Sequence, residues 1–124
     1  MEELIIEPTK KTLGVTCSDG LIKFEGCSIT NDPRVFFKPV KEWIKEYLRD
    51  PESLTLVSLD FEYIDTASVK YIYQILQDLK TTRSNNHTIK VDWHYELDDP
   101  EILELGEILQ SKLDVEFRFI EKEE

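Results

Sequence analysis

The chain has 124 residues, a length that suits one domain with a single hydrophobic core. Hydrophobic residues make up 40% and charged residues 33%, a balance typical of a globular rather than a disordered chain. The formal net charge is −11, from 26 acidic and 15 basic residues, which argues against nucleic acid and anionic membranes as partners because both need a basic surface.

The sequence also argues against membrane insertion and secretion. No apolar run approaches the roughly 20 residues that are needed to cross a bilayer. The start, Met1-Glu2-Glu3-Leu4, is acidic where a signal peptide would be basic. We therefore expect a cytoplasmic protein.

The first predicted elements form a hairpin after a loose lead-in over residues 1–11. Residues 13–18 and 21–27 are predicted to be short strands, and Asp19-Gly20 between them favours a tight turn. This turn would pair Cys17 with Ile22, so that the thiols of the two cysteines do not face each other. We expect both cysteines to be reduced, and without a CxxC spacing they make a poor metal site.

A helix and a long strand are predicted next. Asp32-Pro33 starts the helix and Asp50-Pro51 ends it. Residues 54–64 follow as a strand, and one of its faces carries Val57, Leu59, Phe61 and Tyr63. Leu54 and Leu56 on the other face predict that the first half of this strand is covered on both sides.

The same alternation continues to the end of the chain. A helix begins at Asp65 and ends at residues 84–86, and a strand spans residues 87–97. Asp99-Pro100 opens a third helix, and residues 115–120 form a last strand.

Strands that alternate with helices imply crossover connections and parallel neighbours. We therefore expect one α/β domain over residues 1–124, with a mixed sheet of about five strands. An antiparallel hairpin lies at one edge, and the helices pack on the sheet. Residues 1–11 and 121–124 are expected to be loose termini.

The most informative segment is the junction between the long strand and the second helix. Functional sites of open α/β sheets gather at the carboxyl ends of strands. Thr66 is expected in the first helical turn, where free amides and the helix dipole accommodate a phosphate. A phosphate would add a charge of roughly −1.5 to −2 to the surface. The same residues also suit an ordinary helix start, because helices favour Asp, Ser and Thr there.

The outward side of the second helix is the candidate docking surface. Its predicted partner-binding residues are Asp65, Thr66, Ser68, Lys70, Tyr71 and Tyr73. Tyr71 suits an interface and packing on a neighbouring helix equally well.

Other candidate chemistry is weaker. His94 lies between Asp92 and Glu96 on one strand face, but alternate side chains of a strand rarely converge on a metal. No nucleophile with a base and no glycine-rich phosphate loop is visible. We therefore expect no enzyme activity, no bound metal and no cofactor.

Three segments of the sequence resemble the SiaC family of bacterial regulatory phosphoproteins, which are related in fold to STAS-type anti-anti-sigma factors. These segments are Leu59–Lys70, Val91-Asp92-Trp93-His94-Tyr95 and Phe117-Arg118-Phe119-Ile120. The resemblance spans nearly the whole chain and implies a STAS-like domain. It places the family's phosphorylatable threonine on Thr66, and Ser68 is the backup acceptor because Ala67 replaces a hydroxyl residue.

The resemblance implies a non-catalytic partner-switching module. It implies a serine/threonine protein kinase, an opposing PP2C-type phosphatase and an effector protein. In the best understood branch, the unphosphorylated form binds and activates a diguanylate cyclase and raises cyclic di-GMP. The alternative is a STAS-like sensor of a small ligand or nucleotide. A thermal-shift screen distinguishes the two, because a ligand that binds only the folded state raises the melting temperature.

Overall fold

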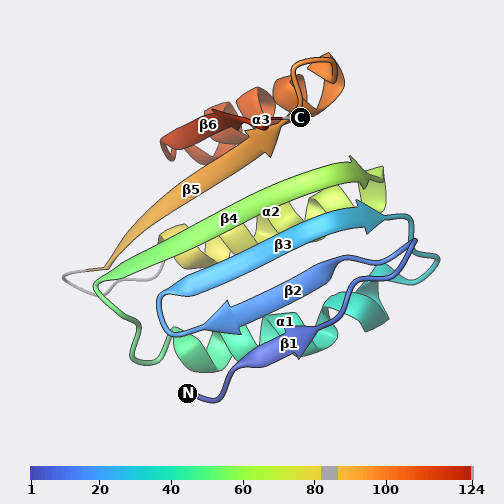
Figure 1. Cartoon of the computed structure of the whole chain (residues 1–124). Coiled ribbons are helices and arrows are strands. Elements are labelled where there is room, and N and C mark those ends of the chain that lie inside the picture. The colour runs from blue at the N-terminus through green and yellow to red at the C-terminus, as the bar shows by residue number, and fades with distance from the viewer. Residues whose placement is uncertain (82–86, 124) are drawn as a thin grey trace.

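The computed structural model describes residues 1–81 and 87–123, and its described part is a six-stranded sheet with three helices (Figure 1). The elements are β1 (Leu4–Ile6), β2 (Gly14–Ser18), β3 (Leu21–Ser28), α1 (Pro33–Tyr47), β4 (Leu54–Ile64), α2 (Thr66–Thr81), β5 (Thr88–Tyr95), α3 (Pro100–Leu113) and β6 (Phe117–Glu121). The predicted α/β class is confirmed, with six strands in place of about five. The predicted helix end at residues 84–86, and Glu124 of the predicted loose tail, lie outside the described residues.

The strands lie in the sheet in the order in which they follow one another along the chain. β1, β2 and β3 are antiparallel neighbours, whereas β3, β4, β5 and β6 are parallel. One helix makes each parallel connection, and successive connections of the same direction and hand place their helices on the same side. Figure 1 shows α1, α2 and α3 behind the sheet, so none of the described helices lies on the opposite sheet face.

This topology brings the βα connections together. The carboxyl ends of β3, β4 and β5 lie at one edge of the sheet because these strands are parallel. The first turns of α1, α2 and α3 follow these strand ends. We call this part of the molecule the C-terminal edge.

The core lies between the sheet and the helices, and its largest fully buried side chains include Trp93, Tyr47, Phe24 and Phe37. The Trp93 indole N–H donates to the carbonyl of Ile102 at 3.0 Å, which ties β5 to the first turn of α3. Gly106 lies against the same indole, and a Cβ atom there would stand 2.5 Å from Trp93 Nε1. The close approach of α3 to the sheet therefore requires glycine at this position.

The additional strand lies within residues 1–11, which the sequence predicted to be loose. β1 pairs antiparallel with β2, and its Leu4 and Ile6 pack half-buried against the core. The Trp43 indole N–H also donates to the carbonyl of Glu2 at 2.8 Å. Three apolar residues are too short a pattern to predict a strand, and the free edge of β2 supplies the partner that orders them.

The last strand likewise extends into the predicted loose terminus 121–124. β6 includes Glu121, and the amide of Lys122 donates to the carbonyl of Tyr95 at 2.8 Å. The Lys122 ammonium also donates to Asp60 at 2.7 Å, which holds this end against β4.

The sheet face opposite the helices is mostly polar. Leu54 and Leu56 lie on this face, and the prediction that both sides of the strand are covered here is wrong. Leu54 is 43% exposed because the described helices all pack on the other face. Farther along β4, Asp60 is half-buried and Glu62 is exposed, as the alternation predicts.

α1 and α3 begin at the predicted Asp-Pro pairs. The carboxylate of Asp32 accepts from the amide of Val35 at 3.3 Å, and that of Asp99 accepts from Ile102 at 3.2 Å. Among the described residues, no helix has the length and apolar character that a membrane span requires.

Candidate functional site

The junction between β4 and α2 is anchored by Asp65. Its amide donates to the carbonyl of Ser28 at 3.0 Å. Its carboxylate accepts from the amide of Ser68 at 2.8 Å, and its carbonyl accepts from the amide of Val69 at 3.0 Å. Asp65 therefore caps α2 and ties the helix start to the end of β3.

Thr66 opens α2 with an exposed side chain at the C-terminal edge. Among the described residues, its hydroxyl has no hydrogen-bond partner. The first-turn amides of a helix lack partners within the helix, and the dipole is positive at this end. The first turn of α2 also contains no acidic residue. The Thr66 side chain is therefore accessible from solvent, and the helix dipole offsets part of any negative charge added there, next to the Asp65 carboxylate that already caps the helix.

Ser68 has the opposite environment. Its side chain is fully buried, and its Oγ lies 2.7 Å from the Oγ of Ser28. A kinase cannot reach a hydroxyl in the protein interior, and a docked partner cannot contact it. The structure therefore corrects the prediction that Ser68 is a backup acceptor and a docking residue. Its role in this fold is to hold the start of α2.

The half-buried Tyr71 lies on the α1 side of α2, whereas the exposed Lys70 lines the hollows on both flanks of this helix. The ring of Tyr71 stacks on that of Phe37, with centroids 5.1 Å apart and an angle of 5° between the planes. The Lys41 ammonium lies 5.6 Å from the centroid of the Tyr71 ring. Tyr71 therefore packs on the neighbouring helix, which was one of the two roles open from its sequence position.

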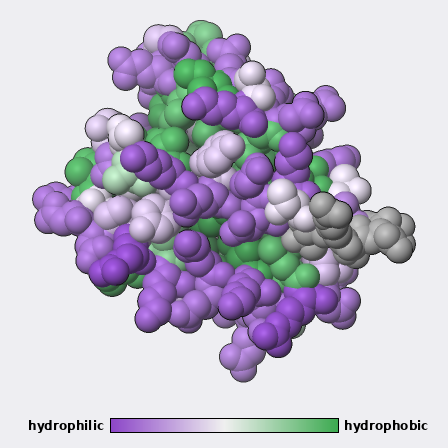
Figure 2. Space-filling model, turned by 180° about the vertical axis from the view of Figure 1, so that it is seen from behind, coloured by the Kyte–Doolittle hydropathy of each residue, from purple (hydrophilic) through white to green (hydrophobic). Residues whose placement is uncertain are grey.

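Tyr73 lies on the other flank of α2. It is half-buried and lines a hollow of about 460 Å³ between α2 and α3, together with Leu105 and Ile108. Seen from the helix side, the surface is mostly hydrophilic, with hydrophobic side chains visible in places (Figure 2). The predicted docking residues are thus divided between the two flanks of α2.

Four hydrophobic side chains at the C-terminal edge are exposed, which the sequence analysis did not predict. They are Ile29 after β3, Val35 in the first turn of α1, Tyr63 near the end of β4 and Leu97 after β5. Their exposed fractions range from 48% to 79%. Strand alternation placed Tyr63 on the inward face, but the residue lies where the helix layer no longer covers the strand. Apolar residues at the strand–helix junctions are the sequence feature from which this exposed hydrophobic surface could have been predicted.

The open sheet face carries polar side chains that bond to one another. His94 Nε2 lies 3.2 Å from the Oγ of Ser58. Both carboxylate oxygens of Asp92 accept from Arg118, at 3.0 and 2.9 Å. In the described part of the chain, no group of three or more His, Cys, Asp or Glu side chains is placed to hold a metal ion.

Neither cysteine has the environment of a reactive thiol. Both are free, and the register pairs Cys17 with Ile22 as predicted. Burial raises the pKa of Cys17 to about 12. Desolvation and then the nearby carboxylate of Glu62, 3.5 Å from the sulfur, raise the pKa of Cys27. Both thiols therefore stay protonated and weakly nucleophilic near neutral pH.

Comparison with known proteins identifies relatives over most of the length of the chain. Apo-SiaC from Pseudomonas aeruginosa is 25% identical with a TM-score of 0.82, covering 99% of this chain and 100% of that one. A chain in the crystal structure of diguanylate cyclase SiaD in complex with its activator SiaC, from the same organism, has a TM-score of 0.87 at 22% identity, covering 96% and 99%. An uncharacterized protein of Pseudomonas aeruginosa strain UCBPP-PA14 is 25% identical over 109 residues, 86% of each chain.

The match to a protein-family model includes both the candidate site and the elements of the fold. The model of the SiaC family regulatory phosphoprotein matches residues 6–122. This range contains the junction of β4 and α2 and every described helix. On this match, the chain belongs to the SiaC family of regulatory phosphoproteins.

Proposed function

We propose that this protein is a non-catalytic partner-switching module controlled by phosphorylation of Thr66. A serine/threonine protein kinase adds the phosphate, and a PP2C-type phosphatase removes it. The unphosphorylated form binds and activates a diguanylate cyclase in the cytoplasm, which raises cyclic di-GMP. Family membership supports a regulatory role, and a SiaC relative occurs in a complex with the cyclase that it activates.

The observation that carries this proposal is the exposed, unbonded hydroxyl of Thr66 within the C-terminal edge. Exposed hydrophobic side chains at the same edge, including Val35 and Tyr63, favour a protein partner there. A hydroxyl at the rim of an apolar surface is tolerated in a complex, but a phosphate is not readily desolvated. The switch therefore acts on the surface that the partner meets.

The arrangement of the helix start explains how the fold tolerates the modification. Asp65 caps the helix through its own carboxylate and leaves the Thr66 side chain free. The positive end of the α2 dipole compensates part of the added charge. We therefore expect phosphorylation to change partner binding and to leave the fold intact.

The first test is mass spectrometry of the protein from its native cells, with a pull-down using wild type and Thr66→Glu. We expect a phosphate on Thr66 and a diguanylate cyclase that is recovered with wild type and lost with the variant. Purified wild type should then raise the cyclic di-GMP output of the recovered cyclase.

Thr88 supplies the matched control, because it is also exposed but lies at the start of β5, at the opposite edge of the sheet. Thr88→Glu should recover the same partners as wild type. No phosphate on Thr66 under any growth condition, together with identical partners for wild type and Thr66→Glu, would return Thr66 to an ordinary helix start.

A further inference from the structure

Basic residues concentrate on α1 although the net charge of the chain is −11. The cations of this helix are Arg34, Lys38, Lys41 and Lys45. The first turns of both α1 and α2 contain no acidic residue, and the carboxylates at these helix starts are those of the capping residues Asp32 and Asp65. The helix dipoles add partial positive charge at the same ends. The α1 side of the helix layer therefore differs in charge from the rest of this acidic molecule.

Three of these cations and one from α2 line a hollow of about 560 Å³ between the two helices. They are Arg34, Lys38 and Lys41 from α1 and Lys70 from α2. Glu42 is the acidic side chain among the lining residues. Within the described residues, Arg34, Lys38 and Lys70 form no ion pair. The hollow therefore presents positive charge that the described part of the chain does not neutralise.

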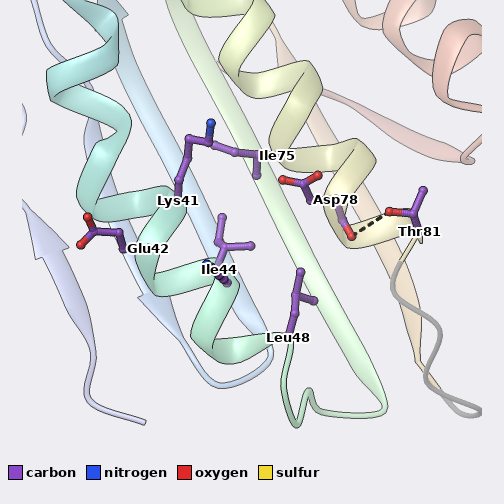
Figure 3. Close-up of a pocket in the computed structure, with 8 residues that line it drawn as sticks. Lys41, Glu42, Ile44, Leu48, Ile75, Asp78 and Thr81 are labelled. Carbon is purple, nitrogen blue, oxygen red and sulfur yellow. Dashed lines mark hydrogen bonds between the residues drawn. The ribbon is translucent and has the colours of Figure 1, made fainter.

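A second hollow of about 410 Å³ continues along the same two helices, and it shares Lys41 and Glu42 with the first. Figure 3 shows Ile44 from α1, Leu48 directly after α1, and Ile75 and Asp78 from α2 around this hollow. We call the two hollows together the α1–α2 groove. Its head, at the helix N-termini, is cationic, and its foot contains apolar side chains.

We propose that the α1–α2 groove is the docking surface for an acidic amphipathic segment of a partner protein. Carboxylates of the segment face the cations at the head, and an apolar side chain of the segment packs on the half-buried Leu48 at the foot, because Ile44 and Ile75 are already buried in the protein. The inference extends the proposed function, because it names the chemistry that a partner must present. The aliphatic parts of the lysine side chains add apolar contact while their ammonium groups bind carboxylates.

The groove fits a protein segment better than an anionic membrane. The cations surround a hollow between two helices, a shape that a chain segment fills more completely than a flat bilayer does. The acidic residues in the rest of the molecule would also repel an anionic surface. Within the groove, an acidic segment faces the cations of the head, and the acidic side chains that line the groove are Glu42 and Asp78.

The groove is continuous with the C-terminal edge. α1 and α2 run parallel because each follows one of two parallel strands, so their N-termini lie at the same edge. Lys70 is one helical turn after Thr66, within reach of a neighbour at i and i+4. A partner on the C-terminal edge can therefore extend a segment into the groove.

The test uses the full chain and a synthetic acidic amphipathic peptide. A helical peptide of about 15 residues matches the length of α1, which has 15 residues. Leucines occupy one face of the peptide, and glutamates flank them. The control peptide has the same composition in an order that removes the apolar face. Nuclear magnetic resonance locates the binding site, and fluorescence anisotropy measures the affinity.

Charge reversal in the groove supplies the decisive comparison. Arg34→Glu with Lys38→Glu should weaken peptide binding about tenfold. Lys90→Glu with Lys112→Glu changes the net charge equally outside the groove and should leave affinity close to wild type. Both groove positions are exposed, and glutamate near a helix N-terminus does not disturb the fold.

Several results would overturn the proposal. The proposal fails if the peptide does not bind, if the resonances that shift lie outside α1 and α2, or if both double variants lose the same affinity for the peptide. It also fails if the reordered peptide binds as tightly as the amphipathic one, or if phosphatidylserine vesicles bind the protein and compete with the peptide. Stimulation of the recovered cyclase is measured in parallel. If the groove variant stimulates it like wild type, the groove inference fails while the proposed function stands. If wild type stimulates no cyclase, the proposed function fails, and the peptide results still decide the groove.

Discussion

The side-chain oxygens of Ser28 and Ser68 lie 2.7 Å apart in the protein interior and join the end of β3 to the first turn of α2. Both residues are essentially unexposed. The amide of Asp65 joins the same two elements a second time through the carbonyl of Ser28. These buried polar contacts fix the start of α2, and they thereby fix Thr66 on the surface beside it.

Replacement of Ser68 by alanine should destabilise the protein by about 1–3 kcal/mol, because the buried hydroxyl of Ser28 then loses its partner. Urea unfolding measures the free energy of unfolding. The double variant Ser28→Ala with Ser68→Ala should lose less than the sum of the single losses, since no orphaned hydroxyl remains. The exposed Ser111→Ala on α3 is the control and should change stability by less than about 0.5 kcal/mol. Strictly additive losses would mean that the two hydroxyls are energetically independent.

Gly106→Ala should destabilise the protein by about 1–3 kcal/mol, because the new methyl group meets the indole of Trp93. The indole must then shift, and its hydrogen bond to Ile102 must lengthen or break. Thermal unfolding measures the loss, and tryptophan fluorescence reports the changed environment. Glu107→Ala, exposed on the same helix, should leave both unchanged. An unchanged melting temperature for Gly106→Ala would show that α3 can move away from the sheet without cost.

Alternation along the strands predicted most of the fold, because a period of two reports which side chains face a neighbouring layer. The same pattern cannot distinguish an apolar side chain that is covered from one that is left exposed. Leu54 and Leu56 were assigned to a buried face for this reason, and they lie on the open side of the sheet. β1 was missed because three residues carry too little pattern.

The sequence predicted that the candidate site lies at the junction of β4 and α2. It did not predict which side chains of this junction are exposed and which are buried. Thr66 and Ser68 differ by two positions on α2, which turns them to different sides of the helix. One hydroxyl is exposed and the other is buried. Which of the two points inward depends on how the helix start sits against β3, and that placement comes from tertiary contacts such as the one with Ser28.

The stability of the protein should depend on pH through His87. Burial lowers the pKa of this side chain, whose Nε2 lies 3.0 Å from the Oγ1 of Thr55. The unfolded state therefore takes up the proton at a higher pH than the folded state. Between the two pKa values, the unfolded state binds more protons, so the free energy of unfolding falls as the pH is lowered through this window.

Urea unfolding between about pH 7 and pH 5 covers the upper part of that window. The variant His87→Gln should lose this component of the pH dependence. The control Lys90→Gln, on the same strand, should keep it. An identical pH profile for wild type and His87→Gln would exclude His87 as a source of the dependence.

Thr66→Glu should change the free energy of unfolding by no more than about 1 kcal/mol, because an acidic residue suits the N-terminal turn of a helix. Thr81→Glu places the same charge in the last turn of α2, where the dipole is negative, and should be the less stable variant. Urea unfolding of both variants against wild type tests the pair. A large loss of stability in Thr66→Glu would mean that charge at this position acts by disrupting the fold, contrary to a switch that acts on docking.

The exposed hydrophobic residues of the C-terminal edge should contribute to effector binding. Val35→Ser and Tyr63→Ser each remove an apolar side chain that is more than half exposed, at 61% and 52% in wild type. We expect each variant to bind the recovered cyclase at least about tenfold more weakly, as is typical when a central apolar contact of an interface is lost. Calorimetric titration measures the affinity, and the melting temperature should change little because neither side chain is buried.

Ile108 is the matched control for this experiment. It is 44% exposed, but it lies on α3 beside the α2–α3 hollow and away from the strand ends. Ile108→Ser removes a comparable apolar side chain and should bind the cyclase like wild type. If Ile108→Ser weakens binding and the two edge variants do not, the effector docks between α2 and α3. A phosphate on Thr66 would then have to act on a surface that the effector does not cover.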